Sequence, residues 1–181
     1  MKTPSFRIGM TALEALVEIV RVCPGINGLS FHPYFPRKSP RGQWPTASLP
    51  ELLTHDRSTV SFRLKRDELT VGNLSRAVSG LNNLELCVLS RVKASRGGVH
   101  CHLPLMDFCC ENTTENLEKV RRFLSEINQK QGVILFSGRS YHYYGAKLMT
   151  PGGWLKFLGQ SLLFTGFTDE RHIGHWLLDG C

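Results

Sequence analysis

The chain has 181 residues, of which 41% are hydrophobic and 20% are charged. That length favours one domain with its own core, and the composition excludes wholesale disorder. Its 22 basic against 15 acidic residues give a net charge of +7, which fits either a phosphate-binding protein or one that charge merely keeps soluble. The apolar runs are too short to span a membrane and the first ten residues lack the apolar stretch of a signal peptide, so we expect a cytoplasmic protein with mostly buried, reduced cysteines.

The first half of the chain predicts helices and strands separated by one long loop. Thr11 and Glu14 have the spacing of a capping box, which predicts the start of a helix that Pro24 and Gly25 end. Residues 32–50 contain five prolines and predict an irregular surface loop. A strand is predicted over 59–65 and a short helix over 73–81. Residues 84–92 and 99–108 are expected to pair as a hairpin around a turn at 96–98.

The second half alternates helices with short strands. Asn112 and Glu115 predict the start of the clearest helix, which ends near Gly132. A buried strand over 133–136, a turn at Gly138 and a strand over 140–144 follow, then helices from Pro151 and over 171–177. We expect a single α+β domain over residues 1–181, with a mixed or antiparallel sheet covered by helices. The last residues suggest a turn into a further strand, as if the C-terminus were truncated.

Three clusters could carry chemistry, and the first is an acidic residue at the end of an apolar strand. Alternation along that strand places Leu103, Leu105, Asp107 and Cys109 on one face. A carboxylate there must be solvated, used as a cap or bound to a cation. Taken alone, the pattern favours an ordinary strand-end carboxylate in a turn.

The second cluster is the hairpin of residues 137–145. A glycine turn exposes backbone amides, and Arg139, Ser140 and His142 add side-chain donors, with Ser140 and His142 expected on one strand face. Such a set suits phosphate oxygens. The alternative is an aromatic hairpin whose histidine is hydrogen-bonded inside the sheet; we favour the phosphate site.

The third cluster spans residues 169–175. Asp169 is predicted to cap the last helix, and Arg171 and His175 would share one of its faces. A zinc site is not favoured at residues 100–102 and 109–110, because adjacent residues of a strand point to opposite faces. The zinc-ligand types at 100–102 and 109–110 therefore cannot converge on one ion without distortion.

The order of these clusters resembles the archaeo-eukaryotic primase superfamily, also called primase-polymerases, over about residues 98–175. That family has two aspartates one residue apart on a strand, then a Ser-x-His motif on a later strand, then a third aspartate after a helix. Here Asp107-Phe108-Cys109, Ser140-Tyr141-His142 and Asp169 stand at those places. The resemblance implies a primase-like palm with an RRM-like core, and nucleotidyl transfer of the DNA primase or polymerase type on a nucleic-acid template.

The resemblance also implies roles for individual residues. Asp107, His142 and Asp169 would be catalytic, and Asp107 and Asp169 would hold Mg²⁺ or Mn²⁺. The residues expected to contact a nucleoside triphosphate are Ser137, Arg139, Ser140, His142 and Arg171. Implied partners are nucleic acid, a nucleotide, and a helicase or another replication or defence protein, with no membrane.

One residue departs from the family pattern. Cys109 stands where the family has its second aspartate, and a neutral thiol is a poor ligand for magnesium. Glu111, on the same face if the strand continues, is the expected substitute ligand. The departure leaves a weakened or inactive transferase, a non-catalytic relative that binds nucleotide or nucleic acid within a complex, or an unrelated interaction protein with a structural histidine hairpin. The relative positions of Asp107, His142 and Asp169 discriminate among them.

Overall fold

The computed structural model of the chain describes residues 10–34, 61–81, 84–93 and 99–180. Within these ranges the helices are α1 (Ala12–Val22), α3 (Val71–Ser79), α4 (Thr114–Glu126), α5 (Pro151–Leu162) and α6 (Glu170–Asp179). The strands are β1 (Gly28–Tyr34), β2 (Phe62–Lys65), β3 (Glu85–Val88), β4 (Arg91–Lys93), β5 (His100–His102), β6 (Leu105–Asp107), β7 (Gly132–Phe136) and β8 (Tyr141–Gly145). The α+β class predicted from the sequence is confirmed.

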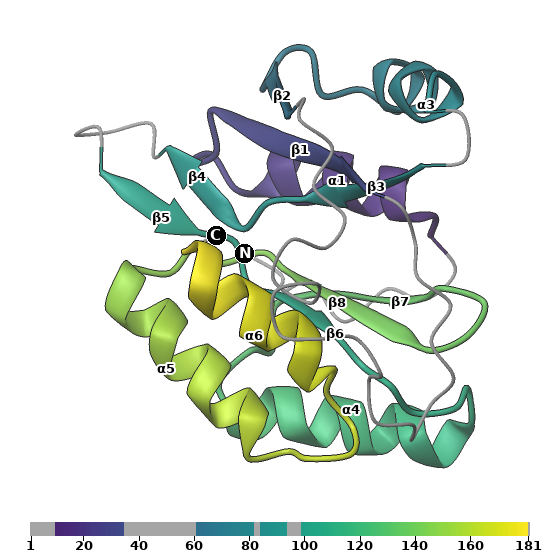
Figure 1. The fold of residues 1–181 in the computed structure, drawn as a ribbon, viewed down its shortest axis with the longest axis vertical. Coiled ribbons are helices and arrows are strands. Elements are labelled where there is room, and N and C mark those ends of the chain that lie inside the picture. The colour runs from purple at the N-terminus through teal and green to yellow at the C-terminus, as the bar shows by residue number, and fades with distance from the viewer. Residues whose placement is uncertain (1–9, 35–60, 82–83, 94–98, 181) are drawn as a thin grey trace, which may run out of the picture.

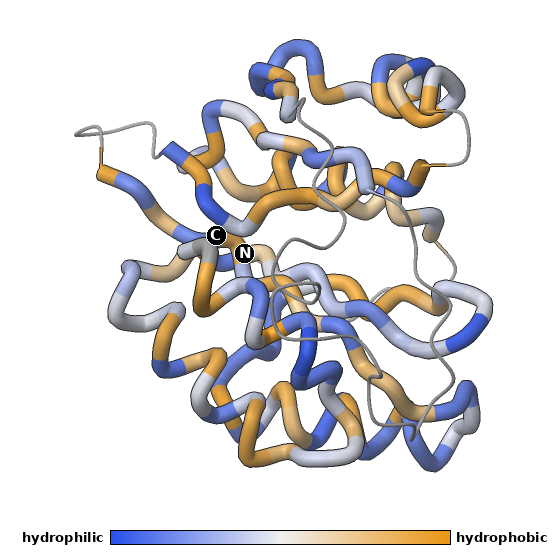
Figure 2. Tube along the Cα trace, viewed as in Figure 1, coloured by the Kyte–Doolittle hydropathy of each residue, from blue (hydrophilic) through white to orange (hydrophobic). Residues whose placement is uncertain are grey.

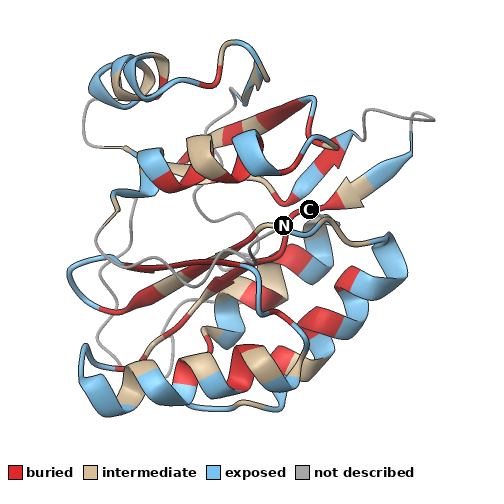
Figure 3. Ribbon diagram, turned by 180° about the vertical axis from the view of Figure 1, so that it is seen from behind, coloured by how far each residue is buried: buried red, intermediate tan, exposed pale blue. Residues whose placement is uncertain are grey.

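The strands form three small antiparallel sheets, in the orders β2-β1-β3, β4-β5 and β6-β8-β7. Figure 1 shows the sheet β2-β1-β3 and α3 at one end of the molecule, and α4, α5 and α6 gathered at the other end beside the sheet β6-β8-β7. Helix α1 packs on the back of β1, as Figure 3 shows, and it also touches β7 and β8. Helix α1 therefore contacts elements at both ends of the molecule, α3 at one and β7 and β8 at the other.

One apolar core joins both ends of the molecule. Its fully buried side chains include Ile19 of α1, Phe31 of β1, Tyr143 of β8 and Phe157 of α5. Figure 2 shows the matching apolar stretches on the inner sides of the helices and along the strands. Burial of this kind is the main stabilising term for a chain of this length. In the described part of the chain, none of the helices has the length and apolar character needed to cross a lipid bilayer.

Helix starts followed the predicted capping chemistry in most cases. The Thr11–Glu14 capping box is present, and Thr150 and Asp169 cap α5 and α6. The predicted cap of α4 was wrong by one residue. Thr113 accepts the hydrogen bond from the Asn116 amide, because the side chain of Asn112 accepts one from the Tyr141 hydroxyl instead, at 2.5 Å.

The predicted loop over 32–50 was wrong at its start, where residues 32–34 complete β1; residues 35–60 lie outside the described part. Pro33 is tolerated because the pairing of β1 with β2 stops at Phe31, so its missing amide removes no bond from that ladder.

The predicted hairpin of 84–92 with 99–108 is also only partly present. The first segment breaks after β3, whose partner is β1, and only β4 pairs with β5. The second segment breaks at Pro104, which lacks an amide, so that β5 and β6 belong to different sheets.

Candidate functional site

The first and second motifs meet directly in one sheet. Strand β6 pairs antiparallel with β8, and Asp107 lies opposite His142 in the register. The His142 Nδ1 atom is 2.5 Å from the Asp107 Oδ1 atom. The strand that carries Asp107 therefore lies in the same sheet as the hairpin that carries His142.

A second histidine, which sequence reasoning did not select, completes this contact. The His172 Nδ1 atom lies 3.3 Å from the Asp107 Oδ2 atom, so each carboxylate oxygen faces an imidazole. His172 is in the first turn of α6, three residues after the Asp169 cap, and Asp169 Oδ1 accepts a hydrogen bond from its backbone amide. The sequence did contain a signal for His172. A residue three positions after an N-cap bonds to the cap through its backbone amide, so the predicted cap places His172 beside Asp169.

Electrostatics favour ionised forms in this cluster. Burial alone would raise the pKa of Asp107, but the charges of His172 and His142 and the hydrogen bond from His142 outweigh it and hold that pKa well below its ordinary value. Burial would lower the pKa of His142, yet Asp107, with smaller contributions from Glu85 and Asp169, raises it. The structure thus favours a carboxylate with a charged imidazole beside it.

The third motif reaches the same place through the backbone. The Asp169 amide donates to the Asp107 carbonyl at 2.8 Å, and Phe108 and Thr168 form an isolated antiparallel bridge. Asp107, His142 and Asp169 are therefore brought together by β6, β8 and the start of α6. The Asp169 side chain is used as a helix cap.

Ser140 has a structural position that differs from the expected one. It is buried, and its hydroxyl can donate to the backbone carbonyl of Phe108 or, at 2.8 Å, to that of Cys110. This contact ties the start of β8 to the segment after β6, so the hydroxyl is directed to backbone rather than to a ligand. Ser137 bonds to Ser140 across the turn, while Arg139 and Arg171 are exposed.

Neither Cys109, at the position of the missing aspartate, nor Glu111 adds a metal ligand beside Asp107. The Cys109 Sγ atom lies 3.4 Å from the Gly166 carbonyl oxygen and 3.5 Å from that of Thr168. Strand β6 ends at Asp107 and the chain bends at Cys110, so Glu111 is exposed and not on a continued strand. The condition for Glu111 as substitute ligand, a strand that continues, is not met.

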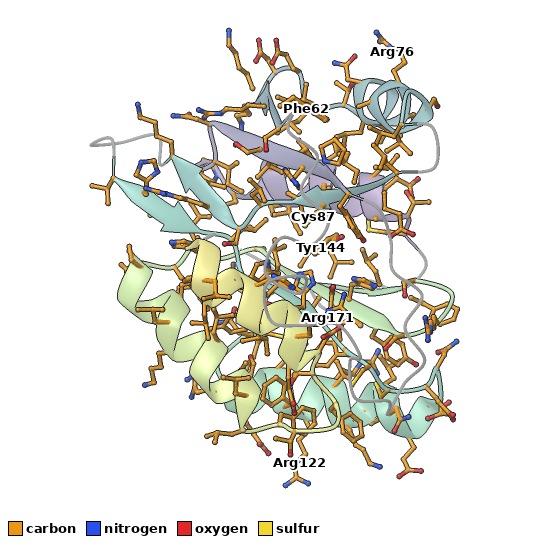
Figure 4. All side chains as sticks on the ribbon, in the orientation of Figure 1. Phe62, Arg76, Cys87, Arg122, Tyr144 and Arg171 are labelled. Atoms are coloured by element: carbon orange, nitrogen blue, oxygen red, sulfur yellow. The ribbon has the colours of Figure 1, made fainter. Side chains whose placement is uncertain are left out.

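A further pair of residues approaches from the sheet β2-β1-β3. The Tyr34 hydroxyl donates to Glu85 Oε2 at 2.7 Å, and the charges of Glu85 and Asp107 help burial to raise the pKa of Tyr34. Figure 4 shows Cys87 of β3 close to Tyr144 of β8, between the two sheets, and Arg171 at the beginning of α6. The sequence did not indicate Tyr34 or Glu85, because Tyr34 fell in the predicted loop and no local pattern shows which strands face each other.

The donor set does not fit a pair of magnesium ions as it stands. Among the residues that the structure describes, no three or more His, Cys, Asp or Glu side chains are grouped to hold an ion. Both oxygens of Asp107 face imidazoles, Asp169 caps a helix and Cys109 faces carbonyls. Two-metal transfer needs carboxylates that are turned to the ions.

An α+β domain that gathers an aspartate, a Ser-x-His segment and a second aspartate at one sheet is a primase-like domain. The family model described as AEP-like, archaeo-eukaryotic primase 1D-like, matches residues 65–181, which is well over half of the chain. The chain belongs to this family. The match begins at the end of β2 and runs through α6. Among curated proteins and among solved structures there is no match.

Proposed function

We propose that this primase-like domain binds the phosphates of a nucleotide at the cluster of His142, Asp107 and His172, and works on nucleic acid with little or no nucleotidyl transfer of its own. One observation carries the proposal: the single well-placed carboxylate of the site has an imidazole at each of its two oxygens, at 2.5 and 3.3 Å. A carboxylate held in this way orients histidines.

The chemistry of imidazole supports phosphate binding there. Because Nδ1 of each ring faces Asp107, Nε2, on the far side of the ring, is directed away from the carboxylate and carries a donor in the protonated form. The side chains of His142 and His172 remain 31% and 30% exposed, so an outside ligand can reach them. Charge-assisted bonds to phosphate oxygens are stronger than neutral ones. The exposed Arg139 in the turn before β8 and the exposed Arg171 beside His172 in the sequence add positive charge to the segments that carry the two histidines.

A second candidate is metal-dependent transfer of the primase type, with Asp107 and Asp169 as ligands. It is favoured by the 2.8 Å backbone contact that brings these two residues together. Against it stand Cys109 at the second acidic position and the use of the Asp169 carboxylate as a cap. Primer extension with Mg²⁺ or Mn²⁺ separates the two candidate functions. If the first is correct, the wild type makes no more product than His142→Gln; if the second is correct, the wild type makes clearly more.

Calorimetry with a nucleoside triphosphate in the presence of a chelator tests the first candidate. Loss of one charge-assisted hydrogen bond, worth about 1.5–3 kcal/mol, should weaken binding roughly 10- to 150-fold in His142→Gln and in His172→Gln. His100→Gln removes an exposed imidazole of β5 outside the cluster and should bind like the wild type. Wild-type protein that binds no triphosphate, or unchanged affinity in both cluster variants, would refute nucleotide binding at this place.

A further inference from the structure

A second feature of the molecule, away from the motif cluster, is an open basic groove. It has a volume of about 480 Å³ and lies between the sheet β2-β1-β3 and the pair β4-β5. Its polar lining consists of Ser30, Arg63, Arg91, Lys93 and His100, and none of the described residues that line it is acidic. No motif residue lines it, so the groove is a separate site.

The positive charges are arranged along the groove by strand pairing. Arg63 lies opposite Ser30 in the pairing of β2 with β1, and Lys93 lies opposite His100 in the pairing of β4 with β5. Arg91 and Lys93 are two residues apart and share a face of β4. All three cations are exposed, and none has an ion pair with a described carboxylate. Their charge is therefore available to a ligand.

We propose that this groove holds the sugar-phosphate backbone of a single nucleic-acid strand, at a place distinct from the nucleotide site. Three cations and a hydroxyl suit a run of phosphates, and Leu89 and Val92 give the groove an apolar part against which sugars can lie. Among the described residues of the lining, His100 is the only aromatic side chain, so we expect contacts to the backbone, which do not depend on sequence, rather than stacked bases. Its concave form favours a strand over a flat membrane surface.

Strand β1 joins the groove to the motif cluster. Ser30, His32 and Tyr34 alternate onto the half-exposed face of β1, while Leu29, Phe31 and Pro33 are buried on the other. Ser30 lines the groove, and Tyr34 bonds to Glu85 next to His142. Four residues of strand span about 13 Å. A strand in the groove is thus directed along β1 towards the bound nucleotide.

The test is fluorescence anisotropy with a labelled 15-nucleotide single strand of mixed sequence, at several salt concentrations. The double variant Arg91→Gln, Lys93→Gln should bind at least tenfold more weakly at low salt. Its salt dependence should fall by about 1.4, since each phosphate contact on a single strand contributes about 0.7 to the slope of log K against log salt. The matched control Lys130→Gln, Lys156→Gln removes two exposed charges from outside the groove and should bind like the wild type.

Nucleotide calorimetry on the same proteins separates this inference from the proposed function. The groove variant should keep triphosphate affinity, and His142→Gln should keep affinity for the oligonucleotide. Equal losses in the groove variant and its control would mean that general charge, and not the groove, holds the strand. Unchanged oligonucleotide binding in the groove variant, with circular dichroism showing a normal fold, would equally overturn the inference.

Discussion

Asp107 lies between His142 and His172, and this arrangement makes the stability of the fold depend on pH in a definite direction. The pKa of Asp107 is depressed in the folded protein. Its contribution to the free energy of unfolding is therefore present at pH values above the ordinary pKa of an aspartate and is lost in strong acid. The pKa of His142 is raised, so its contribution is complete below its ordinary value, about 6.5, and is lost as pH rises through the folded value. The pair therefore stabilises the fold most between about pH 4 and 6.5.

We predict that the wild type loses more stability than His142→Gln between pH 6 and pH 9. Each unit by which the folded pKa of His142 is raised contributes about 1.4 kcal/mol to that difference. Urea unfolding at each pH provides the measurement. If the free energy of unfolding changes equally with pH in the two proteins, the pKa of His142 does not differ between the folded and unfolded states in this range.

Cys109 provides a second prediction at the scale of one residue. An aspartate at this position would bring a negative charge close to the carbonyl oxygens of Gly166 and Thr168, which the thiol now faces. Cys109→Asp should therefore destabilise the metal-free protein by about 1–3 kcal/mol, whereas Cys109→Ser, which keeps a donor, should cost less. If Mn²⁺ restores the melting temperature of Cys109→Asp alone, the position faces a metal site. Equal responses to Mn²⁺ in the wild type and Cys109→Asp mean that it does not.

At the same scale, the sequence indicated residue types better than it indicated their surroundings. Asp107, His142 and Asp169 were selected from their order, and they do meet. The direction of the Ser140 hydroxyl and the approach of Glu85 could not be predicted, because both depend on how the segment after β6 and strand β3 pack in three dimensions.

The hairpin of β7 and β8 permits little change in its backbone. A Cβ atom on Gly132 would lie 2.4 Å from the Tyr144 carbonyl oxygen and 2.5 Å from the Tyr143 ring. Since neither neighbour can move without disturbing the ladder, Gly132→Ala should cost about 3 kcal/mol, at the upper end for overpacking. Gly159 of α5 has nothing within 4 Å of its ideal Cβ position, so Gly159→Ala should stabilise by about 0.5–1 kcal/mol. Denaturant unfolding of both variants checks the contrast in sign, and destabilisation by both would contradict it.

Elements with strong local signals were predicted well, and pairings were not. Helices α1, α4, α5 and α6 have caps and apolar periods, which are local properties, and they appear near the predicted positions. The break between β3 and β4 has no such signal: it depends on Leu89, whose amide bonds to the Ser30 carbonyl at 2.9 Å, and on buried Ser90, which contacts His102. Ser30 is distant from Leu89 in the sequence, so the contact that keeps the first segment on β1 is invisible to local patterns.

At the scale of the whole molecule, the site is assembled from elements that are far apart in the sequence. Strand β6 supplies Asp107, β8 supplies His142, and α6 supplies Asp169 and His172. Strand β3 of the other sheet adds the charge of Glu85. The cluster can therefore be only as well ordered as the packing of α6 and of the two sheets against the common core.

This dependence gives a prediction for α6, whose anchors are Ile173, with 0% exposure, and Trp176, with 6%. Ile173→Ala leaves a cavity directly after His172 and should cost about 2–5 kcal/mol of stability. Because the same change loosens the helix that holds His172 against Asp107, it should also weaken triphosphate binding, measured by calorimetry well below the melting temperature. Leu178→Ala, on a side chain that is 67% exposed in the same helix, should alter neither property. If Ile173→Ala lowers stability and leaves nucleotide affinity intact, α6 supports the fold without positioning the site, and His172 takes no part in binding.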